Sequence, residues 1–301
     1  MDVKNIKTIG VLGCGLMGSG IAQISAAAGF KTIAREITQD LADKGLGNIK
    51  KQLERNAAKG KITEEEKNKT IANLSGTASL DDLKNCDVII EAITEDIKLK
   101  GEIYAYLDKI CPAHTIFASN TSSLTITEMA AFTERSDRFC GMHFFNPVPV
   151  MKLVEIVKGV RTSDETFQTA FELGKVLGKT PIAAKDNSGF VVNFLLVPYL
   201  LGAIRAVQNN TASIEDIDKG MMLGCGYPMG PLTLLDFVGI DTTYRIAEIM
   251  FKEYGESMYA CPPLLRKMFM AGFYGKKSGK GFYDYSSGTP VVNAEIVNYI
   301  K

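Results

Sequence analysis

The sequence lacks an excess of charge of either sign. Its 301 residues include 34 lysines and arginines and 34 aspartates and glutamates, so the formal net charge is +0 at pH 7. The isoelectric point is about 6.7. Proteins that bind nucleic acids or other polyanions usually carry a clear basic excess. The global charge therefore indicates neither nucleic acid nor an acidic surface as a partner.

Clusters of cysteine and histidine are also missing. Six cysteines are scattered without a C-x-x-C spacing, and only two histidines occur. Zinc sites and disulfide frameworks need ligands or cysteines at regular spacings. We therefore expect no metal and reduced thiols, which are usual in the cytoplasm.

No apolar run is long enough for an obvious membrane span. The strongest one, residues 189–204, is uncharged but contains Asn193 and Pro198, and it is shorter than the roughly 20 residues that a bilayer core requires. We expect a buried, kinked helix there. A signal peptide is not expected either, because no basic stretch followed by an apolar segment opens the chain. These features predict a cytoplasmic protein without a membrane partner.

A glycine-rich turn organises residues 7–36. Gly13, Gly15 and Gly18 form G-x-G-x-x-G where an apolar run ends and a helical pattern begins. In a dinucleotide fingerprint these glycines make a tight turn, admit the pyrophosphate and let the helix pack on the strand. Glu36 follows at roughly the 20-residue spacing of the acid that binds the ribose hydroxyls. The combination predicts a dinucleotide site, for NAD or FAD.

Alternating strand and helix patterns continue as far as residue 185. Strands are predicted at residues 7–13, 30–36, 86–93, 115–119, 138–145, 152–157 and 180–185. Helices are predicted from residue 16, twice within 39–74 with a break near 59–62, up to 107, after a capping box formed by Thr125 and Glu128, and at 164–177 after Ser163. This order predicts an α/β fold with a Rossmann-type doubly wound, mostly parallel sheet and an inserted helical pair.

Helical periodicity replaces the strand patterns from residue 189 onward. The length of the chain suggests about two domains, and the change in composition at residues 186–189 is the best candidate for their boundary. We therefore expect a dinucleotide-binding domain over residues 1–187 and an all-α domain over residues 188–301.

His143 is the best-placed candidate for proton transfer. It lies near the carboxyl end of a predicted strand, where open α/β sheets bind ligands, whereas His114 lies in a turn. A histidine among aromatic residues is more often part of the core. Glu155, however, interrupts the apolar run LVEIV, and a buried carboxylate needs a polar partner. We predict that His143 is this partner.

Two polar patterns leave alternatives open. The run SNTSS at residues 119–123 offers hydroxyl and amide donors after a strand, but a simple polar turn explains it about as well. Lys51, Arg55 and Lys59, spaced four residues apart, form a basic helical stripe suited to phosphates. A solvated charged face is the more common explanation of such a stripe.

Seven segments between residues 13 and 285 resemble the L-3-hydroxyacyl-CoA dehydrogenases, particularly the bacterial 3-hydroxybutyryl-CoA dehydrogenases. They are GCGLMGSGIAQ, IIEAITEDIKLK, ASNTSSL, GMHFFNPVPVMKLVE, GFVVN, PMGPLTLLDFVGID and GKKSGKGFYDY. The resemblance implies an NAD-binding lobe, a helical lobe that dimerises, and a substrate between them. The reaction implied is the interconversion of (S)-3-hydroxybutanoyl-CoA and acetoacetyl-CoA in fatty acid or butanoate metabolism.

The same resemblance implies a role for each matching residue. His143 is the general base and Glu155 orients it. Ser119 and Asn193 bind the substrate oxygens, and Lys51 and Arg55 contact the CoA nucleotide. The implied cofactor contacts are Gly13, Gly15, Leu16, Met17, Gly18, Glu36, Glu95, Lys100, Asn120, Ser122 and Asn146.

The sequence departs from the family pattern at two positions. Phe194 stands where an arginine is common, and Glu36 stands where an aspartate is common, preceded by Arg35. An arginine there could bind the 2′-phosphate of NADP, which makes NADP a possible cofactor. Successive strand side chains point to opposite faces, so we expect only Glu36 to face the ribose. This favours NAD.

Two other functions are compatible with the glycine turn. One is a non-catalytic NAD-binding relative similar to a lens crystallin, which would not need His143, Glu155, Ser119 and Asn193 together. The other is a dehydrogenase of free 3-hydroxy acids, which would use a lysine-centred site and would not need the basic stripe.

Overall fold

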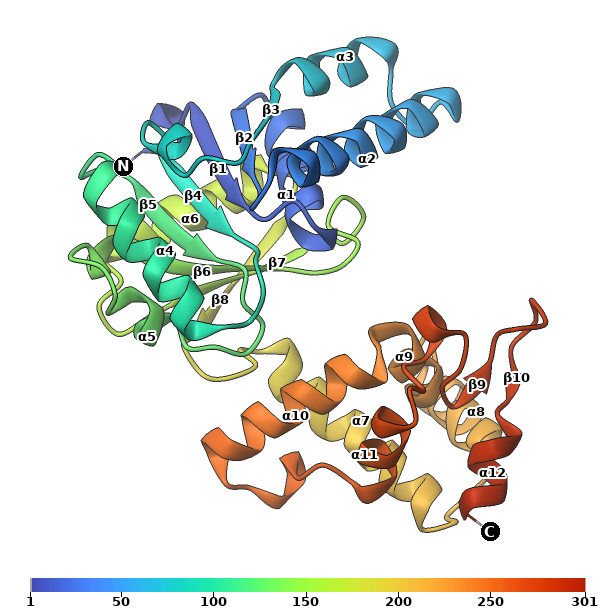
Figure 1. Cartoon of the computed structure of the whole chain (residues 1–301). Coiled ribbons are helices and arrows are strands. Elements are labelled where there is room, and N and C mark those ends of the chain that lie inside the picture. Colours follow the sequence, from blue (N-terminus) through green and yellow to red (C-terminus); the bar gives the residue numbers. More distant parts are fainter. Residues whose placement is uncertain (1, 301) are drawn as a thin grey trace. The chain divides into compact units, whose positions relative to one another are not determined.

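An eight-stranded sheet forms the centre of the first part of the chain in the computed structural model, which describes residues 2–300. In sheet order the strands are β3 (Leu74–Thr77), β2 (Lys31–Arg35), β1 (Thr8–Leu12), β4 (Val88–Glu91), β5 (Ile116–Ser119), β6 (Phe139–Phe144), β7 (Leu153–Lys158) and β8 (Thr180–Lys185) (Figure 1). Neighbouring strands pair in parallel, except that β6 and β7 are antiparallel. The predicted Rossmann-type, mostly parallel sheet is confirmed.

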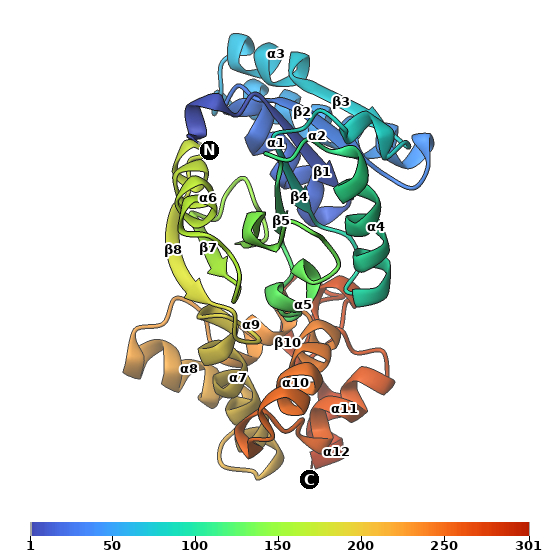
Figure 2. The ribbon, with the colours of Figure 1, turned by 90° about the vertical axis from the view of Figure 1, so that its left-hand side faces the viewer.

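Helices cover both faces of this sheet. They are α1 (Leu16–Ala27), α2 (Gln39–Ala58), α3 (Glu64–Ala72), α4 (Ile97–Ile110), α5 (Ile126–Ala130) and α6 (Asp164–Val176). Successive strand side chains point to opposite faces. Val11 accordingly packs in a core with residues of α1, α2 and α6, and Leu12 in a core with residues of α4 and α5. Figure 2 shows α4 and α6 on opposite sides of the strands. The helical pair predicted between residues 39 and 74 is α2 and α3.

The predicted capping box before α5 is wrong. The side chain of Thr125 makes no capping hydrogen bond to the helix. Instead, Asp186 accepts hydrogen bonds from the N–H groups of Ile126 and Thr127, both at 2.7 Å. A carboxylate satisfies these free N–H groups and also interacts favourably with the positive end of the helix. A residue that follows β8 thus replaces the local cap.

Two strand regions also differ from the prediction. The sequence predicts a helix up to residue 74, but residues 74–77 form β3 and pair with β2. The four residues LSGT carry too short an apolar pattern to indicate a strand by themselves. In the last part of the chain, β9 (Tyr283–Asp284) and β10 (Val291–Val292) form an antiparallel pair. The mostly helical part of the chain after residue 190 therefore contains one small sheet.

The second compact unit begins at Val191, directly after the first unit ends at Phe190. Its helices are α7 (Val192–Gln208), α8 (Ile214–Cys225), α9 (Pro231–Val238), α10 (Ile240–Tyr254), α11 (Pro263–Met270) and α12 (Ala294–Ile300). The predicted buried helix is α7, and its later turns are buried at Leu200, Leu201 and Ile204, whereas Phe194 and Leu195 are exposed. Within residues 2–300, no helix has the length and hydropathy needed to cross a membrane.

Two buried aspartates hold the small sheet against the helices of the second unit. Asp236 accepts hydrogen bonds from the N–H groups of Phe282 and Tyr283, and Asp218 accepts one from the hydroxyl group of Tyr283. Burial raises the pKa of Asp236 to about 6, although the two N–H bonds oppose this shift. Asp236 in PMGPLTLLDFVGID and Tyr283 in GKKSGKGFYDY thus have a structural role in this unit.

Candidate active site

The glycine turn between β1 and α1 has the shape that a dinucleotide requires. Gly13 has a φ of +86°, and a Cβ atom on Gly18 would lie 2.0 Å from the Gly13 carbonyl oxygen. A Cβ atom on Gly15 would meet no atom within 4 Å beyond its chain neighbours, so this side of the turn is open. Gly15 also leaves α1 without a side-chain cap. Free N–H groups at an open helix terminus suit a pyrophosphate, so the turn fits NAD.

Glu36 lies directly against this turn. Its Oε1 atom accepts a hydrogen bond from the Cys14 N–H at 2.6 Å. Burial, and then the charge of Glu36, raise the pKa of the Cys14 thiol to about 11, so the thiol stays neutral and Glu36 supplies the charge here. The neighbouring Arg35 donates from Nε to the carbonyl oxygen of Ala78 at 3.1 Å. The two side chains therefore have different surroundings.

Three of the predicted cofactor residues are linked through Glu95 in the segments that follow β4 and β5. Lys100 is buried, and its ammonium group lies 2.8 Å from Glu95 Oε2. Glu95 Oε1 accepts a hydrogen bond from the Ser122 N–H at 3.0 Å. The structure thus links the start of α4 to the turn that follows β5.

The sequence-based prediction missed Glu91, the last residue of β4. Its fully buried carboxylate lies 3.0 Å from Lys100 Nζ and accepts a hydrogen bond from Ser119 Oγ at 2.6 Å. Burial raises the pKa of Glu91, and the charge of Lys100 opposes this shift. Like Glu155, Glu91 is an acid within an apolar strand, VIIEA, and this pattern could have indicated it. Ser119 is fully buried as well, and its single hydroxyl proton is used by Glu91, so donation to a substrate oxygen would have to replace this bond.

His143 and Glu155 form a buried pair on the two antiparallel strands of the sheet. They are directly opposite each other in the β6–β7 register, and Nδ1 of His143 lies 2.6 Å from Oε2 of Glu155. His143 is 6% exposed and Glu155 is fully buried. The imidazole ring packs near the rings of Phe145 and Phe190. The predicted contact is confirmed, and it leaves Nε2 available for proton transfer.

The two asparagines predicted at the cofactor site follow β5 and β6. Asn120 follows β5, and its Oδ1 atom accepts a hydrogen bond from the Phe144 N–H at 2.8 Å. It thereby ties the end of β5 to the strand that carries His143. Asn146 lies in the loop after β6 and is exposed.

Near the glycine turn, Leu16 is 73% exposed, and Met17 is half-buried.

Asn193 is outside the first unit and lies in the first turn of α7. The adjacent Phe194, which replaces the usual arginine, packs its ring near those of Tyr254 and Tyr259. An aromatic cluster within the second unit thus takes the place of a charged side chain.

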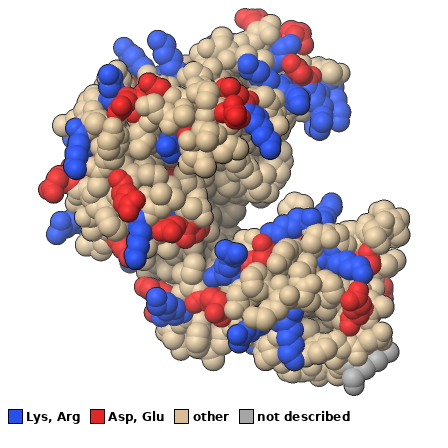
Figure 3. Space-filling view, viewed as in Figure 1, with Lys and Arg blue, Asp and Glu red and all other residues tan. Residues whose placement is uncertain are grey.

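The basic stripe lies on the exposed side of α2. A surface hollow is lined by Asn48, Lys51, Gln52, Arg55, Asn56, Lys59 and Lys61. Figure 3 shows blue side chains gathered over this end of the helix. No ion pair within residues 2–300 involves Lys51 or Arg55. Cationic side chains that line a hollow and have no acidic partner can bind phosphate groups. This arrangement favours a phosphate site over a solvated charged face as the explanation of the stripe.

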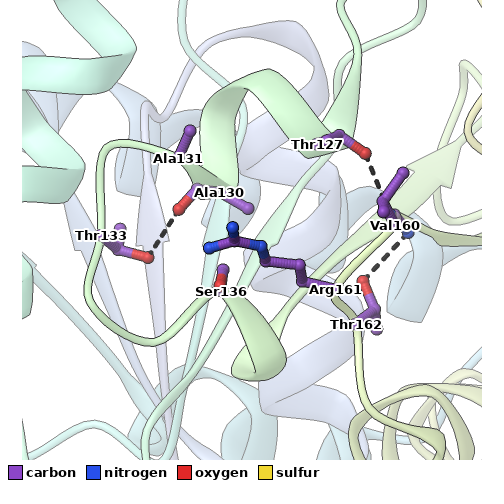
Figure 4. A pocket seen from close by; sticks show the side chains of 9 residues that line it. Thr127, Ala130, Ala131, Thr133, Ser136, Val160, Arg161 and Thr162 are labelled. Atoms are coloured by element: carbon purple, nitrogen blue, oxygen red, sulfur yellow. Dashed lines mark hydrogen bonds between the residues drawn. The ribbon is translucent and has the colours of Figure 1, made fainter.

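A second hollow lies beside α5, and none of the predicted site residues lines it. Arg161 extends across it between Ser136 and the end of the helix (Figure 4). The hydroxyl groups of Thr133 and Thr162 donate to the carbonyl oxygens of Ala130 and Phe139. Because these polar groups bond within the protein, the hollow lacks a set of converging catalytic groups. His114 lies elsewhere, 53% exposed and 3.2 Å from Asp87, as expected for a bystander.

Two family models match the chain. Residues 8–187 match the 3-hydroxyacyl-CoA dehydrogenase NAD binding domain, and residues 189–285 match the C-terminal domain of the same family. The chain belongs to the 3-hydroxyacyl-CoA dehydrogenase family. The family membership and the NAD cofactor predicted from the sequence are thereby confirmed.

Similar members of the 3-hydroxyacyl-CoA dehydrogenase family come from bacteria and animals. The probable 3-hydroxybutyryl-CoA dehydrogenase of Bacillus subtilis is 49% identical over 94% of this chain and 99% of its own length. The human mitochondrial hydroxyacyl-coenzyme A dehydrogenase is 47% identical over 93% of this chain and 91% of its own length. The crystal structure of (S)-3-hydroxybutyryl-CoA dehydrogenase PaaH1 from Ralstonia eutropha has a TM-score of 0.90 and 45% identity, covering 94% of this chain and 100% of that chain.

Proposed function

We propose that the protein is an oxidoreductase that interconverts (S)-3-hydroxybutanoyl-CoA and acetoacetyl-CoA with NAD. The 2.6 Å contact between His143 and Glu155 carries this proposal. It gives the protein an imidazole that can act as acid or base and whose orientation is fixed by a carboxylate. This pair belongs to the same sheet as the glycine turn that fits the cofactor. The family and the names of the similar proteins supply the substrate class.

Each residue then has a defined task. The glycine turn and Glu36 bind the cofactor, which when bound exchanges a hydride with the substrate carbon. His143 removes the proton of the 3-hydroxyl group through Nε2 and returns it to the 3-keto oxygen in the reverse direction. Glu155 accepts the hydrogen bond from Nδ1, which keeps the ring oriented and stabilises the imidazolium form. Ser119 and Asn193 hydrogen-bond the substrate oxygens.

Reduction of acetoacetyl-CoA by NADH tests the proposal directly. The purified protein is expected to oxidise NADH when acetoacetyl-CoA is added, and not when free acetoacetate is added. Turnover of the free acid alone would identify a dehydrogenase of 3-hydroxy acids. Binding of NADH without turnover of either compound would identify a non-catalytic relative.

The hollow on α2 leads to a prediction about CoA. Replacing both Lys51 and Arg55 by Ala should raise KM for acetoacetyl-CoA about tenfold, because charge-assisted hydrogen bonds to phosphate are lost. KM for NADH should change little, and the salt dependence of the thioester KM should weaken. Steady-state kinetics at two salt concentrations measure all three.

The matched control removes two exposed lysines from elsewhere in the first unit. Lys84 and Lys109 are both exposed, and both lie outside the hollow. Replacing both by Ala changes the net charge by the same amount and should leave KM for the thioester unchanged. Equal effects of the two double variants, or equal effects on both substrates, would contradict a CoA contact on α2.

We also propose that the protein is a cytoplasmic homodimer of fatty acid or butanoate metabolism, joined through the second unit. Leu195, Leu223 and Phe237 in that unit are 67%, 84% and 52% exposed, and exposed large apolar side chains often mark interfaces. A mass near 32.8 kDa, that of one chain, in light scattering would contradict the dimer.

A further inference from the structure

Lys179, just before β8, is a buried lysine with no role assigned so far. It is 8% exposed. Its ammonium group donates hydrogen bonds to the main-chain oxygens of Val148 and Met151, the latter at 2.8 Å. No ion pair within residues 2–300 involves Lys179.

This arrangement is energetically costly. Burial lowers the pKa of Lys179, and the positive charge of Lys152 lowers it further. A buried cation normally has a carboxylate partner or several hydrogen bonds that offset its loss of hydration. Here the two carbonyl groups provide the offset, so the lysine and the segment that carries these carbonyls depend on each other.

That segment, residues 145–152, joins the two strands of the His143–Glu155 pair. It also carries Asn146. Its own turn is closed by hydrogen bonds from the N–H groups of Val150 and Met151 to the carbonyl oxygen of Pro147, both at 2.9 Å. On one side, Val148 packs against α1: a Cβ atom on Gly20 would lie 2.7 Å from the Val148 Cβ. Lys179 binds the segment by donating hydrogen bonds to two of the segment's main-chain oxygens.

The backbone of Lys179 is itself fixed. Gly178, with a φ of +75°, ends α6, and the N–H of Lys179 donates to the Gly174 carbonyl oxygen at 3.0 Å. This is the Schellman arrangement of a helix C-terminus. The next residue, Thr180, donates to the Lys152 carbonyl oxygen at 2.7 Å. The lysine side chain therefore extends toward the loop from a backbone segment that is fixed by hydrogen bonds on both sides.

We propose that Lys179 is a positioning residue for the reaction. Through the carbonyl groups of Val148 and Met151 it fixes the loop that carries Asn146 and connects the strands of His143 and Glu155. It does not touch the reacting atoms. The kinetic consequence rests on the proposed function, whereas the effect on the loop does not.

The test compares variants that remove the hydrogen bonds with variants that keep them. Lys179→Met keeps the length of the side chain but has no donor, and Lys179→Gln keeps a donor without the charge. Lys175→Met is the matched control, because Lys175 lies on the exposed side of α6 and pairs with Glu172 at the surface. The measurements are amide hydrogen exchange of residues 145–152, KM for NADH, and kcat for acetoacetyl-CoA reduction.

We expect Lys179→Met to speed hydrogen exchange in residues 145–152 while α6 stays protected. It should lower kcat by about 10- to 100-fold, as small displacements of catalytic groups do, and it should raise KM for NADH. Lys179→Gln should retain more activity than Lys179→Met, and Lys175→Met should match the unaltered protein. In an Asn146→Ala background, the effect of Lys179→Met on KM for NADH should shrink, because both changes act on one loop.

Unchanged exchange of the loop in Lys179→Met would overturn the proposal, as would full additivity with Asn146→Ala. If Lys179→Met does not fold, Lys179→Gln carries the test; failure of both to fold would make the lysine a requirement for folding rather than a positioning residue. Faster loop exchange in a protein whose unaltered form turns over no thioester would refute the proposed function and leave the loop contact standing.

Discussion

His143→Ala is expected to lower kcat for acetoacetyl-CoA reduction by about 10² to 10⁴-fold while NADH binding persists. His143 is the buried histidine whose ring is held by Glu155, with Nδ1 at 2.6 Å from the carboxylate. Without it, no other imidazole in the described part of the first unit is positioned to exchange a proton with the substrate, because His114 is exposed beside Asp87. Rapid kinetics and NADH fluorescence titration separate loss of chemistry from loss of binding.

His114→Ala is the matched control and should retain full activity. Glu155→Gln should also be impaired, since a neutral amide stabilises the imidazolium form less well than a carboxylate. Because Glu155 acts through His143, adding Glu155→Gln to His143→Ala should lower kcat little further. Undiminished turnover in folded His143→Ala would end the assignment of this pair.

Glu36→Ala is expected to reduce the preference for NADH over NADPH by roughly one to two orders of magnitude. Glu36 is fixed against the glycine turn by its bond to the Cys14 N–H. In this position the Glu36 carboxylate should accept hydrogen bonds from the ribose hydroxyl groups, and its negative charge should repel the 2′-phosphate of NADPH. The ratio of kcat/KM values for the two cofactors, measured with acetoacetyl-CoA, gives the preference.

Arg35→Ala is the companion variant. Arg35 donates to the Ala78 carbonyl oxygen rather than bonding to the turn, so its removal should change NADH kinetics little. A clear preference of the unaltered protein for NADPH, lost in Arg35→Ala, would show that the arginine controls the cofactor pocket instead.

Several features could be predicted because their causes are local or depend on simple patterns. Gly13 has a positive φ, Gly18 leaves no room for a Cβ atom, and Gly15 keeps the turn open toward a pyrophosphate, so the fingerprint appears in the sequence itself. The contact between His143 and Glu155 could be inferred because a carboxylate in an apolar strand must find a polar partner. The side-chain cap at Ser163 acts within three residues, and α6 begins where the sequence predicts.

The sequence by itself thus determined the alternating fold, the glycine turn, the acid–base pair and the family, since these depend on short-range geometry or on periodic burial. Only the tertiary structure decided which distant groups meet. Asp186 replaces Thr125 as the cap of α5, β3 becomes a strand because β2 offers an edge, and Lys179 reaches carbonyl groups of a loop that precedes it by many residues. Such hydrogen bonds form where burial removes water from polar groups, and the sequence shows each group without showing which partner the fold will bring to it.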